Sequence, residues 1–166
     1  MPEFHLLSAG YGGDRVASTV SLVEADDALV VIDPGMVSST SVILDPMLRL
    51  GHHPEAVTDV VISHHHPDHT INIALFPNAK VHDHWAIYKD DIWTSRPAEG
   101  FEVASGVVLL ETPGHTAQDI TTVAETPRGT VAFTHLWWYA EAPHDDPLAT
   151  DPDGLHVGRE RVLEVA

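Results

Sequence analysis

Apolar residues in the first half of the chain fall into short runs with the spacing of buried strands, separated by one stretch with the spacing of an amphipathic helix. The runs predict strands at residues 4–10, 17–25 and 26–35. The last run ends in the turn signal Asp-Pro-Gly. Residues 39–50 have the helical pattern, which Gly51 would end, although Pro46 predicts a break or a restart inside it.

The alternation continues after this helix. An apolar run at residues 56–63 predicts a further buried strand, and the polar segment behind it predicts the start of a helix over residues 68–75. A short strand is expected within residues 78–84, and the aromatic residues of 85–93 surround a helix-like stretch. This order of strand, helix and strand is typical of an α/β protein.

The second half is richer in strands. Residues 106–115 predict a strand that ends at a Pro-Gly turn, and residues 119–135 predict a hairpin with "TPRG" as its turn. Residues 149–166 predict a late helix, which Asp151 would cap with Pro152 at its first position. No repeat or linker interrupts the chain, so that we expect one α/β domain over residues 1–166.

Length and composition agree with this expectation. A chain of 166 residues with 43% hydrophobic and 20% charged residues suits one globular domain with a real core. No apolar window approaches a membrane span, and the first residues lack the pattern of a secretory signal, which favours a cytoplasmic location. The net charge of −17 is unfavourable for a nucleic-acid partner, which generally requires a basic surface.

The chain has 13 histidines and no cysteine. The lack of cysteine excludes disulfides, iron–sulfur clusters and thiolate zinc sites. A metal site in this chain therefore has to use imidazole and carboxylate ligands.

Residues 64–69 concentrate this chemistry in the sequence "HHHPDH". His64 and His66 are two positions apart, so that on extended backbone their side chains point the same way. Asp68 and His69 follow a proline that bends the chain, and the two pairs can approach a metal from two sides. These ligand types suit zinc, with iron or manganese as alternatives. The other interpretation is a surface loop in a histidine-rich chain.

A second segment agrees with a metal site. His115 lies behind the Pro-Gly turn at the end of another predicted strand. It would complete a set of three imidazoles with His64 and His66, and three protein ligands plus a water are the pattern of catalytic zinc. His65 is expected to point away from the metal, because its neighbours point toward it.

Four segments together resemble the metallo-β-lactamase superfamily of metallohydrolases. They are "VVIDPG" at residues 30–35, "SHHHPDH" at 63–69, "TPGHTAQD" at 112–119 and "GTVAFTHLWW" at 129–138. The chain looks most similar to the short, soluble branch that includes a nuclease acting on histone transcripts. The resemblance implies a four-layer αββα sandwich with the site at one edge, between the two sheets.

The resemblance also implies two groups of metal ligands. For a first ion they are His64, His66 and His115, and for a second ion they are Asp68 and His69. One or two zinc ions are therefore the expected cofactor.

Asp33 matches an aspartate that supports the site from behind the ligands, although a plain turn residue is an equally open interpretation. His135 stands where the family usually has an aspartate that bridges both metals. A neutral imidazole cannot bridge two ions about 4 Å apart, so that His135 would ligate one of them or form a hydrogen bond nearby.

The family also has one more strand and a Gly-His loop after the last helix. This sequence ends at Ala166 without them, so that we expect a truncated form of the fold lacking the last strand and loop. Such a form would have an exposed sheet edge, and association of two chains into a homodimer stays open.

The first functional hypothesis is a hydrolase that directs a metal-bound hydroxide at a small ester, thioester, lactone or lactam, with Asp68 orienting the hydroxide or taking its proton. The alternatives are a metal-binding family member with little or no activity, a phosphodiesterase or nuclease, and iron-based redox chemistry. A small-molecule substrate is expected, with nucleic acid and membrane disfavoured.

Aromatic residues follow the last predicted strand. Trp137, Trp138 and Tyr139 could line a substrate pocket, and ordinary core packing is the alternative. His144 is expected to be a solvated histidine outside the site.

Overall fold

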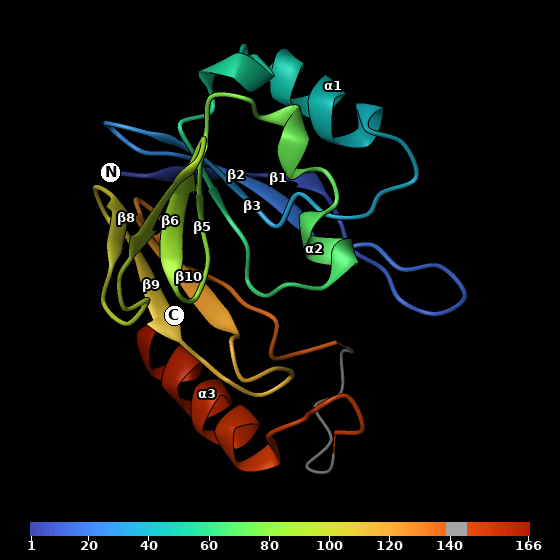
Figure 1. Ribbon diagram of the computed structural model, residues 1–166, viewed down its shortest axis with the longest axis vertical. Helices are drawn as coiled ribbons and strands as arrows, with labels where there is room; N and C mark the ends of the chain where they lie inside the picture. Colours follow the sequence, from blue (N-terminus) through green and yellow to red (C-terminus); the bar gives the residue numbers. More distant parts are fainter. Residues whose placement is uncertain (139–145) are drawn as a thin grey trace.

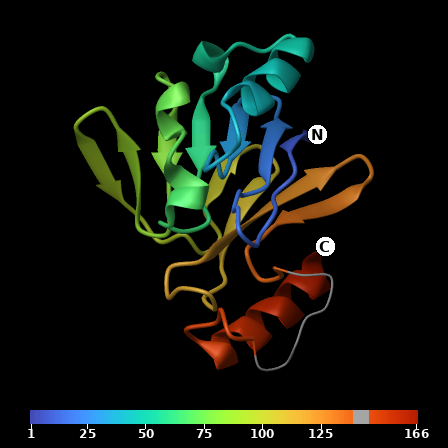
Figure 2. The same ribbon diagram turned by 90° about the vertical axis from the view of Figure 1, so that its right-hand side faces the viewer.

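The computed structural model describes residues 1–138 and 146–166, so that the expectations for Tyr139 and His144 lie outside the described residues. Two β-sheets pack face to face, and helices cover the outer face of each (Figure 1). The layers follow each other as helix, sheet, sheet and helix (Figure 2). The hairpin of residues 86–95 and the hairpin of residues 120–133 project on opposite sides (Figure 2). The αββα architecture expected from the family resemblance is confirmed.

The first sheet has seven strands in the order of the sequence. They are β1 (Glu3–Ser8), β2 (Val20–Glu24), β3 (Leu29–Ile32), β4 (Asp59–Val61), β5 (Lys80–His82), β6 (Ala86–Lys89) and β7 (Ile92–Ser95). Strands β3, β4 and β5 are parallel to one another, and the other neighbours are antiparallel. The carboxyl ends of β3 and β4 therefore meet at one edge of the sheet.

The second sheet has four antiparallel strands in the order β11-β10-β9-β8. They are β8 (Glu102–Ala104), β9 (Val107–Glu111), β10 (Ile120–Thr126) and β11 (Gly129–Phe133). The predicted hairpin is confirmed, with Thr126 opposite Gly129 at its turn.

The helices are α1 (Ser41–Arg49), α2 (Pro67–Thr70) and α3 (Pro152–Val165), and two 3-10 turns are η1 (Pro54–Ala56) and η2 (Ile73–Leu75). The predicted late helix is confirmed. Asp151 caps it, because its Oδ1 accepts a hydrogen bond from the Gly154 N–H at 3.0 Å. Among the described residues, no helix is long and apolar enough to cross a membrane.

Strands β2 and β3 bury both of their faces, which explains their nearly continuous apolar sequence. Leu22 and Val31 pack toward α1, whereas Val23 and Val30 pack into the space between the two sheets. A third cluster joins α3 to the end of the second sheet through Leu136, Leu155 and Val162. The alternation of side chains along the central strands therefore binds the helical and sheet layers into one core.

Three local predictions are wrong. Pro46 does not break α1, because Ile43 and Met47 on the turns around it are fully buried against the sheet and offset the missing hydrogen bond. The helix expected over residues 68–75 is also shorter, since α2 ends at Thr70 and a separate 3-10 turn follows.

The stretch at residues 85–93 is not helix-like. It belongs to the hairpin formed by β6 and β7, in which Tyr88 pairs with Trp93 across the strands with ring centroids 4.7 Å apart. Asp90 takes a left-handed backbone conformation at the turn, with φ +53°. Cross-strand aromatic contact and turn geometry therefore override the helical spacing.

Gly35 is the point at which the turn after β3 touches the segment after β4. A Cβ at Gly35 would lie 1.5 Å from the backbone oxygen of Asp68. We expect the Gly35→Ala substitution to lower the free energy of unfolding by about 3 kcal/mol, because the two backbones must separate. Urea denaturation of both forms measures this difference.

Gly12→Ala is the matched control, because a Cβ there meets no atom of the described residues within 4 Å. This substitution should change the free energy of unfolding by less than about 1 kcal/mol. Equal urea midpoints for the two variants would contradict the close packing described for Gly35.

Candidate metal centre

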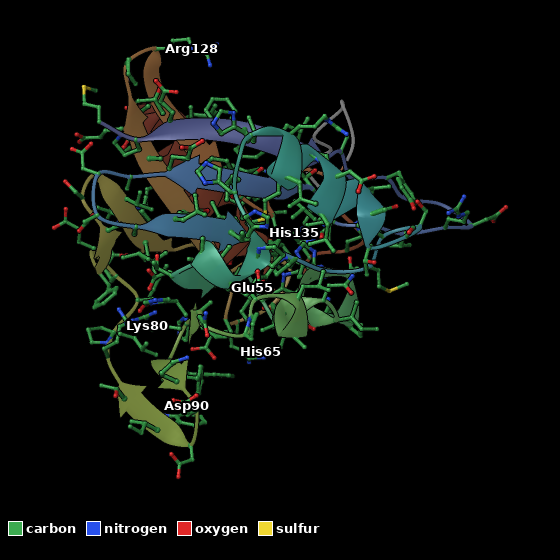
Figure 3. All side chains as sticks on the ribbon, turned by 90° about the horizontal axis from the view of Figure 1, so that it is seen from above. Glu55, His65, Lys80, Asp90, Arg128 and His135 are labelled. Atoms are coloured by element: carbon green, nitrogen blue, oxygen red, sulfur yellow. The ribbon has the colours of Figure 1, made fainter. Side chains whose placement is uncertain are left out.

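The candidate ligands lie on segments that follow four strands and meet at one edge of the sandwich. Asp33 follows β3, residues 63–69 follow β4, His115 follows β9, and His135 follows β11. His135 lies in the interior of the view in Figure 3, whereas Asp90 and Arg128 mark the tips of two projecting hairpins. The two sheets thus supply the site jointly, and residues far apart in the sequence become neighbours.

Three imidazole nitrogens converge at this edge. The Nε2 of His64 lies 2.9 Å from the Nδ1 of His66, and the Nε2 of His115 lies 3.0 Å from the same Nδ1. Nitrogen ligands of a tetrahedral zinc ion, at bonds of about 2.05 Å, lie about 3.3 Å apart. The predicted trio is therefore together, at nearly the spacing that a zinc ion requires, although residues 63–66 form bends and do not extend β4.

The tautomer of His115 is fixed by a backbone carbonyl. Its Nδ1 lies 2.6 Å from the oxygen of Leu148, which can only accept, so that Nδ1 carries the proton. The Nε2 of His115 then keeps its lone pair for a metal. Thr150 also donates its hydroxyl to the backbone oxygen of His115 at 2.7 Å, which holds this loop in place.

The ring of His64 is buried and has polar neighbours on the side away from the trio. Its Nδ1 lies 3.2 Å from the Ser63 hydroxyl and 3.9 Å from Asp119 Oδ1. Burial lowers the pKa of His64 well below its ordinary value, and the nearby His69 and His135 lower it further. His64 is therefore neutral at physiological pH, which is the form that binds metal.

Asp33 contacts His69 and the segment that carries the trio. Its Oδ2 lies 2.9 Å from His69 Nδ1, and its Oδ1 accepts a hydrogen bond from the Ser63 N–H at 2.6 Å. Burial alone would lower the pKa of His69, but the hydrogen bond and charge of Asp33, together with Asp68, raise it. Asp33 is thus a partner of a candidate ligand as well as a turn residue, with φ +51°.

His69 and Asp68 form the second group of predicted ligands. The Nε2 of His69 is buried and has no hydrogen-bond partner among the described residues, and Asp68 Oδ2 lies 3.4 Å from it. Asp33 accepts the proton on Nδ1, so that in neutral His69 the Nε2 carries a lone pair to which no described residue donates a hydrogen bond. An unpartnered lone pair beside a carboxylate suits a divalent cation, so that the donor set of the site fits a metal.

His135 lies among the other rings. Its ring centroid is 4.6 Å from that of His64, 4.5 Å from that of His69 and 4.9 Å from that of His115. One nitrogen each of His64, His115 and His135 lie within 4.8 Å of one another. The Nε2 of His135 accepts a hydrogen bond from the indole N–H of Trp138 at 2.7 Å.

A pocket of about 590 Å³ opens beside these residues. Its described lining includes Trp137 and Trp138, which also pack against the third core cluster, together with Asp68, His69 and His135. The loop between β1 and β2 also lines the pocket, with residues 10–13 and 16–19, although the sequence pattern does not predict this. The signal available for this loop was the glycine-rich segment "GYGG", which favours a turn but does not show where the loop lies.

His65 points away from the trio, as expected. Its Nε2 lies 3.0 Å from Asp83 Oδ2, and its ring contacts Trp85 with centroids 5.2 Å apart. The side chain is therefore held at the side of the first sheet and does not enter the pocket.

Residues 13–162 match the family model described as "Metallo-beta-lactamase superfamily". The chain is 30% identical over 185 aligned positions to Metallo-beta-lactamase domain-containing protein 1 of Xenopus laevis, covering 98% of this chain and 75% of that protein. It is 31% identical to the protein of the same name from Mus musculus, covering 93% of this chain but only 61% of the relative.

The structure is also similar to that of an N-acyl homoserine lactone hydrolase with the product N-hexanoyl-L-homoserine bound at its catalytic metal centre. The TM-score is 0.66 at 20% identity, over 99% of this chain and 87% of the other. At this identity the similarity concerns the fold. Because the family model covers nearly all of the sequence and the fold agrees with it, the chain belongs to the metallo-beta-lactamase superfamily of hydrolases.

Proposed function

We propose that this protein is a metal-dependent hydrolase of a small, uncharged acyl substrate: an ester, a thioester, a lactone or a lactam. The observation that carries the proposal is the convergence of three imidazole nitrogens beside a pocket. His64, His66 and His115 would hold a divalent ion, for which zinc suits the ligands best and iron or manganese are alternatives.

A bound ion of this kind lowers the pKa of a coordinated water to near 7 and polarises the oxygen of the bond under attack. The chain itself supplies Asp68, which lines the pocket and whose Oδ2 lies 3.4 Å from His69 Nε2. Asp68 would accept the proton of the attacking water at one of its Oδ atoms. Asp33 holds His69 and Ser63 in place and so keeps the loop that carries Asp68 in register.

The pocket favours an uncharged substrate. Its described lining contains no lysine or arginine, and its walls include Ile32, Phe133 and Trp138. A phosphodiester would meet Asp33 and Asp68 without a cationic side chain from these lining residues, on a protein of net charge −17. The lactone hydrolase of similar fold binds an acylated product at its metal centre, which supports an acyl substrate here.

Metal binding by the trio is tested first. We expect His66→Ala and His115→Ala each to weaken zinc binding by more than about 100-fold, because each removes a ligand. Competition with a chromophoric chelator measures the affinity, and elemental analysis gives the ions bound per chain.

His65→Ala is the matched control, since this histidine belongs to the same motif but contacts Asp83. It should leave the zinc affinity unchanged. Equal losses for His65→Ala and His66→Ala would show that the motif does not bind metal through the nitrogens identified above.

Hydrolysis is tested with metal-loaded protein on a panel of uncharged and charged substrates. The panel consists of p-nitrophenyl acetate, an aliphatic lactone, an acyl thioester, a lactam and bis(p-nitrophenyl) phosphate. We expect turnover of at least one acyl substrate, because the described lining of the pocket has no cationic side chain to bind phosphate. Release of product is followed spectrophotometrically or by pH-stat titration.

A chelator and the His115→Ala variant should both abolish this turnover. Turnover restricted to the phosphodiester would overturn the choice of substrate. Tight metal binding without any turnover would favour the alternative of a metal-binding family member with little activity.

A further inference from the structure

The hydrogen bond between Trp138 and His135 determines which nitrogen of His135 carries a proton. An indole N–H can only donate, so that the Nε2 of His135, 2.7 Å away, must offer its lone pair. A protonated imidazolium would have no lone pair there. His135 is therefore a neutral imidazole whose proton lies on Nδ1.

This arrangement is the opposite of the one found in the neighbouring histidines. In His115 and His69, an acceptor binds the Nδ1 proton and leaves the Nε2 lone pair free for a metal. In His135, Trp138 already uses the one lone pair of the ring. His135 lies close to His64 and His115, and so to the place where an ion would bind. It has no free lone pair with which to bind that ion.

We propose that His135 is not a metal ligand but a hydrogen-bond donor in the pocket, held in its Nδ1–H form by Trp138. This inference rests on the proposed hydrolase function for the identity of the acceptor. The acceptor is the substrate oxygen that gains negative charge as the acyl bond is attacked. His135 lines the pocket among the rings of His64, His69 and His115, where such an oxygen would lie.

The geometry gives this donor two advantages. Its direction is set before substrate binds, because the bond to Trp138 fixes the ring, and Trp138 in turn packs against His115 with ring centroids 5.4 Å apart. A donor that is already oriented needs no reorganisation when charge develops, which is the property that makes such groups effective. Trp138 is accordingly a positioning residue, which acts through His135.

Metal titration separates the two roles of His135 without any substrate. We expect His135→Ala and His135→Asn to bind zinc with the affinity of the unmodified protein, because neither removes a ligand. His115→Ala, the reference for a lost ligand, should lose more than about 100-fold. A loss in His135→Ala as large as that in His115→Ala would overturn the proposal.

The tautomer can be observed directly. In protein labelled with ¹⁵N-histidine and loaded with zinc, long-range ¹H–¹⁵N spectra should show His135 with a protonated Nδ1 and an unprotonated Nε2. Trp138→Phe removes the indole donor and should change the Nε2 shift of His135 while His115 keeps its metal-bound pattern. A metal-bound shift at either nitrogen of His135 in the unmodified protein would refute the assignment.

Turnover on the acyl substrate tests the donor role. The side-chain amide of asparagine can place an N–H close to the position of the histidine Nδ1. We therefore expect His135→Ala to lower kcat by about 100-fold with a smaller change in KM, and His135→Asn to restore a substantial part of it. Equal losses in both variants would contradict a donor role.

The two proposals fail separately. If no acyl substrate is turned over, the hydrolase function fails, and the zinc titration and the NMR assignment still decide whether His135 is a ligand. If turnover is found but His135→Ala loses its zinc, the hydrolase function stands and the role assigned to His135 is wrong.

Discussion

The segment that carries the predicted metal ligands after β4 depends on one residue, Asp33, through both its backbone and its carboxylate. Its backbone N–H binds the oxygen of Val61, its backbone oxygen accepts from Ser18, and its two Oδ atoms bind Ser63 and His69. The turn after β3 is thereby fastened to the end of β4, to the loop that lines the pocket and to the histidine loop. Gly35 allows this, since any side chain there would separate the two backbones. The backbone therefore places the candidate ligands on this segment.

The hydrogen bonds around the site also determine which ring nitrogens of the histidines carry protons. The carbonyl of Leu148 and the carboxylate of Asp33 fix the tautomers of His115 and His69 so that each Nε2 lone pair faces inward. Burial and the neighbouring rings lower the pKa of His64, which keeps that ring neutral as well. Because His64 is already neutral, an ion bound there would not have to displace a proton from this buried ring. The tautomers and the neutral ring of His64 are therefore preorganised for an ion.

The sequence predicts most of the residues that meet at the site. It does not predict the elements whose structure depends on contacts between distant residues. The spacing of His64, His66 and Asp68 after a buried strand, and of His115 after a Pro-Gly turn, is local information, and the structure brings these residues together. The β6–β7 hairpin was missed because its pairing of Tyr88 with Trp93 overrides a helix-like spacing. The pocket wall from the β1–β2 loop could not be located either, since its position follows from the packing of two sheets.

The histidine at position 135 has a consequence for the number of ions. Two divalent cations about 4 Å apart repel each other by about 16 kcal/mol at an effective dielectric constant near 20, four times the value for unit charges. A bridging carboxylate offsets part of this repulsion, and a neutral imidazole whose lone pair is bound by Trp138 does not. Among the described residues that line the pocket, the acidic side chains are Asp33 and Asp68, and Asp33 is already bound by His69 and Ser63. If the proposed metal site is correct, this arrangement would favour one ion over two, with the Nδ1–H of His135 taking the place of a second cation in stabilising negative charge.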